Sequence, residues 1–125
     1  IIEKRRPCPG CAEVMNLIGE VEGRTALLID DIVDTAGSLC EGAKALKEHG
    51  AKRVFAACSH AILSDPAVAR IDESPIERLI ITDTIPLPPE KHSDKFVVLT
   101  MAEAIGDVMV RILSHQSVSK LFNKA

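Results

Sequence analysis

The sequence contains no tryptophan and no tyrosine, and only three of its 125 residues are phenylalanine. Aliphatic side chains must therefore fill the core, and hydrophobic residues at 46% of the chain are enough for one modest domain. Lys and Arg number 15 against 18 Asp and Glu, so the net charge is −3 and no basic stripe is present. The shortage of stacking rings and of clustered positive charge together argue against nucleic-acid binding.

Long apolar runs are also missing. Apolar runs such as 26–29 and 96–99 fall far short of the ~20 residues that cross a membrane, and no signal peptide is recognisable. Four cysteines in a chain with its own apolar core do not make a disulfide scaffold, so we expect a reducing cytoplasm. Cys8 and Cys11 form a C-x-x-C pair without the two further soft ligands that zinc requires, and we expect neither a metal site nor another role for them.

The order of predicted elements is typical of an α/β protein with a parallel sheet. The apolar run 25–29 predicts a central strand that is buried on both faces. Apolar residues recur at helical spacing over 36–49, and Gly50 suits the left-handed residue that ends such a helix. Further strands are predicted at 53–58, 78–82 and 96–99, and a second long helix at 101–113.

The remaining segments give weaker predictions. Asp65 and Pro66 predict a helix start, with Asp65 as the N-cap and Pro66 in the first turn. Residues 13–21 and 25–29 flank a glycine-containing turn and could pair as a hairpin, whereas residues 1–10, with charges, Pro and Gly, are expected to be mobile. The tail 117–122 predicts one helical turn.

The strongest functional signal is the acidic end of the first buried strand and the small-residue turn that follows it. In open α/β sheets, ligands bind at the carboxyl ends of the strands. The turn 34–38 opens a helix, so a phosphate there could accept backbone N–H bonds and meet the positive end of the helix dipole. The preceding carboxylates suit sugar hydroxyls or a hydrated Mg²⁺. We therefore predict a ribose 5-phosphate site at Asp30, Asp31, Asp34, Thr35, Ala36, Gly37 and Ser38.

A purely structural interpretation of the same residues stays open. Asp34 could cap the helix, and Asp30 and Asp31 could be solvated residues at a strand end. His60, just past another strand end, could touch the site, although we expect a structural role for it.

The string from Leu27 to Ser38 resembles the sugar-phosphate signature of the phosphoribosyltransferase fold, which has apolar residues, Asp-Asp and then Thr-x-Gly-Ser/Thr. Upstream, Lys4-Arg5-Arg6-Pro7 is similar to the flexible catalytic loop of the ribose-phosphate pyrophosphokinases, and the resemblance continues to Ser117-Val118-Ser119-Lys120-Leu121-Phe122. It covers essentially the whole chain. The fold that it implies is a parallel-sheet, phosphoribosyltransferase-like α/β fold with flanking helices.

The resemblance implies transfer of the diphosphoryl group of MgATP to the 1-hydroxyl of ribose 5-phosphate, which gives 5-phosphoribosyl 1-diphosphate and AMP. It assigns Lys4 a transition-state role, gives Arg6 a contact with the phosphorylated substrates, and makes residues 1–12 a mobile catalytic loop. Cationic loops of this kind supply charge to the transferring oxygens and exclude water. Ser117 and Ser119 match a region associated with an allosteric phosphate site, or they cap a terminal helical turn.

Family members are longer, with an N-terminal half that supplies much of the ATP pocket and the main Mg²⁺ ligands, and they form homo-oligomers of the hexamer type. Because the sequence starts at Ile1 and lacks that half, we expect residues 1–125 to be the C-terminal domain of a longer synthetase, inactive alone. A phosphoribosyltransferase would share the acidic strand but has no reason to carry Lys4-Arg5-Arg6-Pro7. A non-catalytic regulatory subunit should have lost part of the site.

Overall fold

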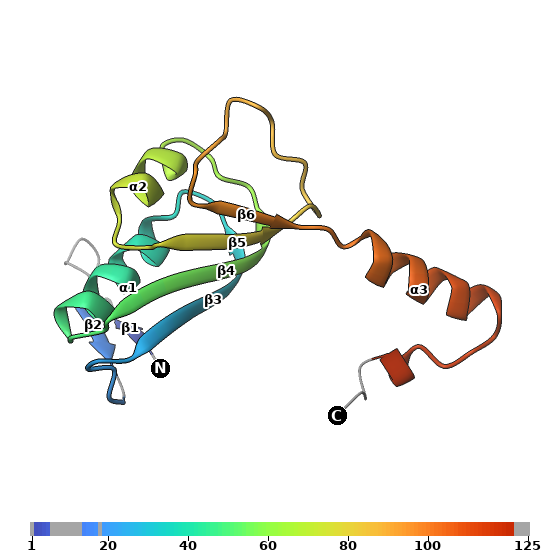
Figure 1. The fold of residues 1–125 in the computed structure, drawn as a ribbon, viewed down its shortest axis with the longest axis horizontal. Coiled ribbons are helices and arrows are strands. Elements are labelled where there is room, and N and C mark those ends of the chain that lie inside the picture. The colour runs from blue at the N-terminus through green and yellow to red at the C-terminus, as the bar shows by residue number, and fades with distance from the viewer. Residues whose placement is uncertain (1, 6–13, 18, 122–125) are drawn as a thin grey trace.

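The computed structural model describes residues 2–5, 14–17 and 19–121. Their elements, in chain order, are β1 (Ile2–Arg5), β2 (Val14–Leu17), β3 (Thr25–Val33), α1 (Gly37–Glu48), β4 (Arg53–Ala61), α2 (Ala67–Glu73), β5 (Arg78–Thr82), β6 (Phe96–Leu99), α3 (Ala102–Leu113) and the 3₁₀ turn η1 (Ser119–Leu121) (Figure 1).

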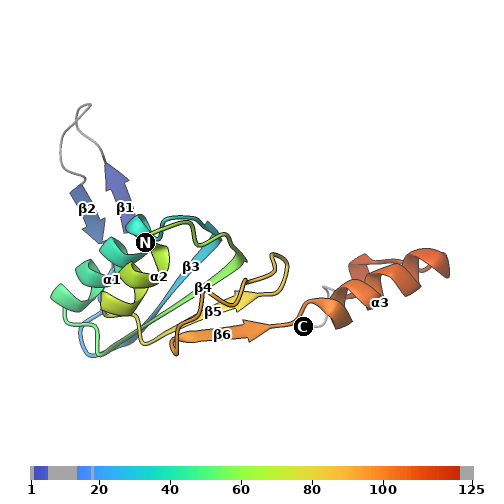
Figure 2. The ribbon, with the colours of Figure 1, turned by 90° about the horizontal axis from the view of Figure 1, so that it is seen from above.

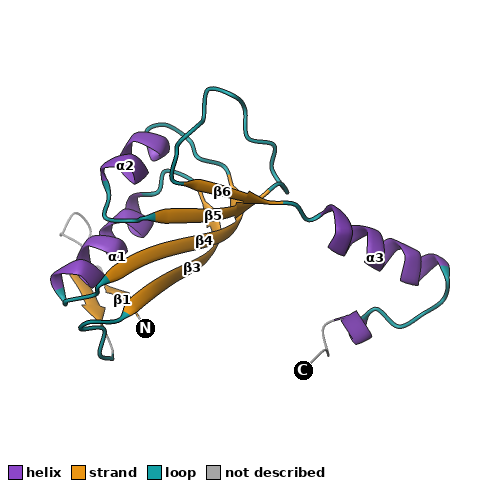
Figure 3. Cartoon of the chain, in the orientation of Figure 1, coloured by secondary structure: helices purple, strands orange, loops and turns teal. Residues whose placement is uncertain are grey.

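The main sheet has four parallel strands in the order β3-β4-β5-β6. Helix α1 connects β3 to β4 and α2 connects β4 to β5, so strands and helices alternate as the sequence predicts. Figure 3 shows the four strands as one twisted layer with α1 and α2 beside it. The α/β class, the parallel sheet and the flanking helices are confirmed.

Two predictions about the first part of the chain are wrong. Strand β3 is an edge strand of the described sheet, and the side chains of Leu27 and Ile29 are 53% and 78% exposed instead of buried. Strand β2 pairs antiparallel with β1 and not with β3. The turn expected to make a hairpin instead fixes the start of the parallel sheet, because the N–H of Gly23 donates to the carbonyl of Gly50, at the turn before β4, over 2.8 Å.

Helix α1 follows the predicted pattern. Its buried residues face the sheet: Leu39, Cys40, Gly42, Ala43 and Leu46. The helix ends at Glu48, and Gly50 follows with a left-handed φ of 85° and an N–H that donates to the Lys47 carbonyl.

Helix α2 starts differently from the prediction. Pro66 occupies the N-cap position, no side chain caps the helix, and the helix begins at Ala67. Asp65 is therefore not the cap, because the N–H of Ala67 is already bonded to the Ser64 carbonyl in a preceding turn. At the other end, the ammonium group of Lys95 donates to the carbonyls of Ile71, Asp72 and Ser74 at 2.8–2.9 Å. One lysine thus satisfies the last carbonyls of this helix.

The core lies between the sheet and the α1–α2 layer. Its largest completely buried side chains are Leu63, Ile71, Ile76, Leu79, Ile81 and Val54. The opposite face of the sheet carries no helix in the described part of the chain, and α3 extends away from the body with none of its residues buried (Figure 2). At the carboxyl ends of β3 and β4, Val33 and Ala61 are buried, whereas Ile32 is 47% exposed.

Candidate functional site

The carboxyl end of β3 presents two exposed carboxylates to solvent. The N–H of Asp31 donates to Oδ1 of Asp30 over 3.0 Å, and the N–H of Ile32 donates to Oδ1 of Asp31 over 2.8 Å. Each carboxylate is thereby oriented by a short local bond while both residues stay exposed. Oriented, solvated carboxylates can accept hydrogen bonds from the hydroxyls of a sugar.

The turn after β3 leads directly into the amino end of α1. Ala36 occupies the N-cap position in a left-handed conformation, with φ 57° and ψ 9°, although its side chain is buried. No side chain caps the helix. Asp34 therefore does not act as the helix cap. The helix begins at Gly37, next to the two carboxylates in the chain, with its positive dipole end facing out.

Gly37 has an ordinary helical backbone, so its lack of a side chain is not needed for the fold. A Cβ placed there would lie 3.7 Å from Nη1 of Arg70 and 4.0 Å from Oγ1 of Thr35, which are ordinary contacts. The left-handed residue is its neighbour Ala36. A side chain at Gly37 would therefore contact Arg70 and Thr35, and its absence lets a ligand approach the backbone closely.

Arg70 of α2 is a site residue that the sequence analysis missed. Its Nη1 donates to the carbonyl of Thr35 over 3.0 Å. Nothing in the local sequence pattern signals this contact, because the two residues are 35 positions apart and meet only when α2 packs beside α1.

A hydroxyl network lies at the carboxyl ends of the next two strands. Nδ1 of His60 is 2.9 Å from Oγ1 of Thr84, and the hydroxyls of Thr82 and Thr84 both donate to the carbonyl of Ser59. His60 lies opposite Ile32 of β3 in the strand register, so this network borders the acidic end of β3. The contact with Thr84 is consistent with the structural role expected for His60.

The other predicted residues lie elsewhere in the chain. Lys4 belongs to β1, opposite Met15, so residues 2–5 form a strand where a mobile loop is expected. Arg6, the rest of the segment 6–12, Cys8 and Cys11 lie outside the described residues. The hydroxyls of Ser117 and Ser119 are 2.7 Å apart at the predicted terminal turn, and the Ser117 carbonyl accepts a bond from Arg111 over 3.3 Å.

The two buried cysteines are not poised for nucleophilic chemistry. Burial, and secondarily the charge of Asp30, raises the pKa of the Cys58 thiol to about 11. Burial also raises the pKa of the Cys40 thiol. Since the thiolate is the reactive form, both side chains act as small apolar core residues at neutral pH.

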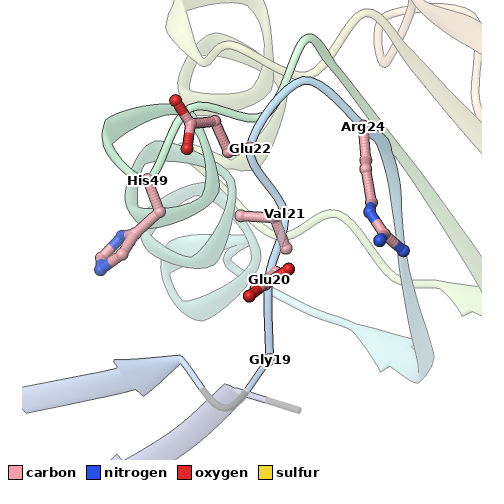
Figure 4. Close-up of a pocket in the computed structure, with 6 residues that line it drawn as sticks. All are labelled: Gly19, Glu20, Val21, Glu22, Arg24 and His49. Carbon is pink, nitrogen blue, oxygen red and sulfur yellow. The ribbon is translucent and has the colours of Figure 1, made fainter.

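A pocket of about 530 Å³ lies at the opposite end of the sheet from the acidic strand end. Figure 4 shows the residues that line it, Gly19, Glu20, Val21, Glu22, Arg24 and His49, around the start of β3 and the end of α1. Two glutamates there oppose an anionic ligand, but Arg24 also lines the pocket, and the imidazole Nδ1 of His49 is 2.7 Å from the Ala45 carbonyl. What distinguishes the carboxyl end of the sheet is the helix amino end that no side chain caps.

Among the described residues, neither a metal-binding cluster nor a membrane-spanning helix is present. No group of three or more His, Cys, Asp or Glu side chains there could hold a metal ion. No helix within 2–5, 14–17 and 19–121 is long and apolar enough to cross a membrane.

Comparison with known proteins shows extensive similarity. Residues 3–123 match the family described as the phosphoribosyl synthetase-associated domain. The chain is 56% identical over 123 residues to a ribose-phosphate pyrophosphokinase of Oceanobacillus iheyensis, covering 98% of the chain and 39% of that relative. It is 54% identical over 122 residues to ribose-phosphate pyrophosphokinase 1 of Listeria monocytogenes, covering 98% of the chain and 38% of the relative.

The fold is similar to a crystal structure of phosphoribosylpyrophosphate synthetase from Mycobacterium smegmatis. The TM-score is 0.78 at 32% sequence identity, over 83% of this chain and 34% of that one. The chain thus spans about two fifths of the length of these curated relatives.

Proposed function

The chain belongs to the phosphoribosyl synthetase-associated domain family, and from that premise we propose that it provides the sugar-phosphate half of a ribose-phosphate diphosphokinase. In that reaction the diphosphoryl group of ATP passes to the 1-hydroxyl of ribose 5-phosphate, and the products are 5-phosphoribosyl 1-diphosphate and AMP. The observation that carries the proposal is the junction of β3 and α1, where two oriented carboxylates precede a helix amino end that no side chain caps.

The two parts of this junction match the two parts of the substrate. Asp30 and Asp31 accept hydrogen bonds from the ribose hydroxyls, and residues 34–38 hold the 5-phosphate through backbone N–H groups at the positive end of α1. The absence of a side chain at Gly37 leaves the backbone N–H groups of this turn accessible to the phosphate. The sugar hydroxyl is the nucleophile, so no covalent intermediate with the protein is required.

Lys4 and Arg6 are proposed to stabilise the diphosphoryl group while it is transferred. Positive charge that meets developing charge on the diphosphoryl oxygens is the main catalytic contribution that a protein makes to such transfers. Residues 1–12 provide that charge from a catalytic loop, of which residues 2–5 form β1 in the structure. Ser117 and Ser119 are assigned to a regulatory phosphate site.

Magnesium fits these residues only in part. The carboxylates Asp30 and Asp31 are suitable oxygen ligands, but the described residues hold no cluster of three potential ligands. Mg²⁺ in phosphoryl-transfer sites is commonly held by one or two carboxylates together with water and substrate phosphates. When bound, the ion would neutralise charge on the diphosphate, and we assign its principal protein ligands to the part of the longer relatives that this chain does not span.

We further propose that the protein is cytoplasmic and forms a homo-oligomer.

Titration calorimetry with ribose 5-phosphate tests the proposed site directly. We expect binding to the 125-residue chain, no binding to a folded Gly37→Val variant, and a milder loss in Asp31→Asn. Ribose alone and inorganic phosphate alone are the ligand controls, and circular dichroism confirms folding. Unchanged affinity in folded Gly37→Val would show that the loop is only a helix start.

Turnover tests the assignment of Lys4 and of the missing half. The isolated chain should release no AMP from ATP and ribose 5-phosphate, and robust turnover by chain free of full-length contaminant would contradict this. In a full-length relative, replacing the lysine that corresponds to Lys4 by alanine should lower kcat by orders of magnitude with ATP binding largely kept. An effect on KM alone would contradict the transition-state role.

A further inference from the structure

We propose that Arg70 is a positioning residue for the sugar-phosphate loop, acting on the backbone of Thr35 and not as a direct ligand of the phosphate. This inference rests on the proposed function, because it assumes that residues 34–38 bind the 5-phosphate. Arg70 lies in the last turn of α2, outside every motif that the sequence analysis singled out.

The hydrogen bond between Arg70 and Thr35 orients the backbone of the loop. Nη1 of Arg70 donates to the Thr35 carbonyl over 3.0 Å, and the same nitrogen lies 3.7 Å from the place of a Cβ on Gly37. In a trans peptide the carbonyl and the following N–H point in opposite directions. A guanidinium that fixes the Thr35 carbonyl therefore also directs the N–H of Ala36 away from Arg70, toward the side where a ligand can approach.

The residue after Thr35, Ala36, has a strained backbone conformation. Ala36 is left-handed, which costs free energy for a residue that carries a Cβ, and its side chain is buried. Such a conformation persists only where surrounding contacts hold it. The Arg70 bond immediately precedes Ala36, and the Ala36 carbonyl then accepts the N–H of Cys40 over 3.0 Å in the first turn of α1.

The positive charge of Arg70 lies near the amino end of α1. A cation beside a helix amino end is unfavourable, because the dipole there is already positive. In the described part of the chain, the ion pair within 4.0 Å joins Arg53 and Glu77, and Arg70 has no carboxylate partner. The guanidinium therefore has the Thr35 carbonyl as its acceptor in place of a carboxylate, which is expected of a residue that holds the loop and not of a surface ion pair.

The backbone of Arg70 is itself anchored. The Cys40 thiol of α1 donates to the Arg70 carbonyl at 3.5 Å. Arg70 is therefore bonded twice to this part of the chain: its side chain donates to Thr35 in the turn before α1, and its carbonyl accepts from Cys40 of α1. The bond from Cys40 of α1 thus helps to keep the Arg70 guanidinium beside the Thr35 carbonyl.

The test compares ribose 5-phosphate affinity in the 125-residue chain and two variants, Arg70→Ala and Arg70→Gln. Loss of a charge-assisted bond should weaken binding about tenfold in both. Arg111→Ala is the matched control, because Arg111 also donates to a carbonyl, that of Ser117, but lies on α3. Its affinity should equal that of the parent chain. Melting temperatures show whether the variants fold. If Arg70→Ala does not fold, the affinity of Arg70→Gln provides the test.

Two further measurements separate positioning from direct ligation and from simple packing. In ligand-free protein, the amide resonances of Ala36 and Gly37 should shift in Arg70→Ala. The salt dependence of ribose 5-phosphate binding should keep the parent slope, whereas loss of a direct phosphate ligand would reduce it. Parent affinity in a folded Arg70 variant, or a reduced salt slope, would overturn the inference while leaving the proposed function intact. Failure of the parent chain to bind ribose 5-phosphate would overturn both.

Discussion

The two faces of the parallel sheet differ sharply. On the face covered by α1 and α2, Val54, Ala56 and Leu79 are completely buried. On the other face, residues that lie side by side in the register form one apolar row across all four strands: Ile29, Ala57, Ile80 and Val97. Ile29 at one end of this row is 78% exposed and Val97 at the other is 38% exposed.

This difference teaches where the stability of the candidate site comes from. Strands of parallel sheets are normally buried on both faces, yet in the described residues only the α1–α2 face forms a core. The loop 34–38, Arg70 and the start of α1 all belong to that covered side. The geometry of the proposed sugar-phosphate site therefore depends on the α1–α2 layer, and the apolar side chains of the other face and of α3 contribute little to it.

The largest expected effect contrasts one residue from each face. Leu79→Ala should lower the free energy of unfolding of the 125-residue chain by about 2–5 kcal/mol, because Leu79 is fully buried and its removal leaves a cavity. Ile29→Ala, at a position 78% exposed, should change it by less than about 0.5 kcal/mol. Urea denaturation measures both. Equal losses would mean that the second face is covered in solution.

A smaller effect is expected at the end of α2. Lys95→Met keeps the apolar stem but removes the ammonium group that satisfies three carbonyls of the covered side. The Ile71 carbonyl would keep its bonds from the N–H and the hydroxyl of Ser74, but the bonds to the carbonyls of Asp72 and Ser74 would be lost, which should destabilise the chain by about 1–3 kcal/mol. Lys52→Met, at an exposed position, is the control and should be nearly neutral. If the two variants unfold at the same urea concentration, Lys95 is not the cap of this helix.

The smallest effect is a pH dependence from Cys58, which points into the covered side. Burial raises the pKa of its thiol to about 11 from an ordinary value of 9.0. The folded protein therefore holds this proton more tightly than the unfolded chain, so stability is unaffected below about pH 9 and falls as the pH rises toward 11. Cys58→Ala should show a shallower fall over this range. Parallel profiles for the two proteins would contradict the assignment.

Much of the covered side could be predicted from the sequence. The strands at 78–82 and 96–99 and the helix that ends before Gly50 follow from short apolar runs, helical spacing and one left-handed glycine. The edge position of β3 could not be predicted, because an apolar run shows that a strand prefers burial and not whether a second layer covers it. The pairing of β2 with β1 instead of β3 could not be predicted either, because the turn before β3 bonds to Gly50, 27 residues away from Gly23.

The candidate site was predictable where it is continuous in sequence. The two carboxylates and the turn 34–38 form one string, and the structure places them together at one sheet edge. The conformation of Ala36 and the contact of Arg70 with Thr35 were not predictable. Alanine gives no sign of a left-handed backbone, and a bond between residues 35 positions apart arises only from the packing of two helices.

The central claim is that the sugar phosphate binds at the carboxyl end of β3 and the amino end of α1. The most direct measurement is a titration of ¹⁵N-labelled chain with ribose 5-phosphate, followed through the backbone amide resonances. We predict that the largest shifts fall on Asp31 and on residues 35–39, with small ones at Glu22, Arg24 and His49 around the opposite pocket. Shifts concentrated at that pocket, with residues 35–39 unchanged, would contradict the account.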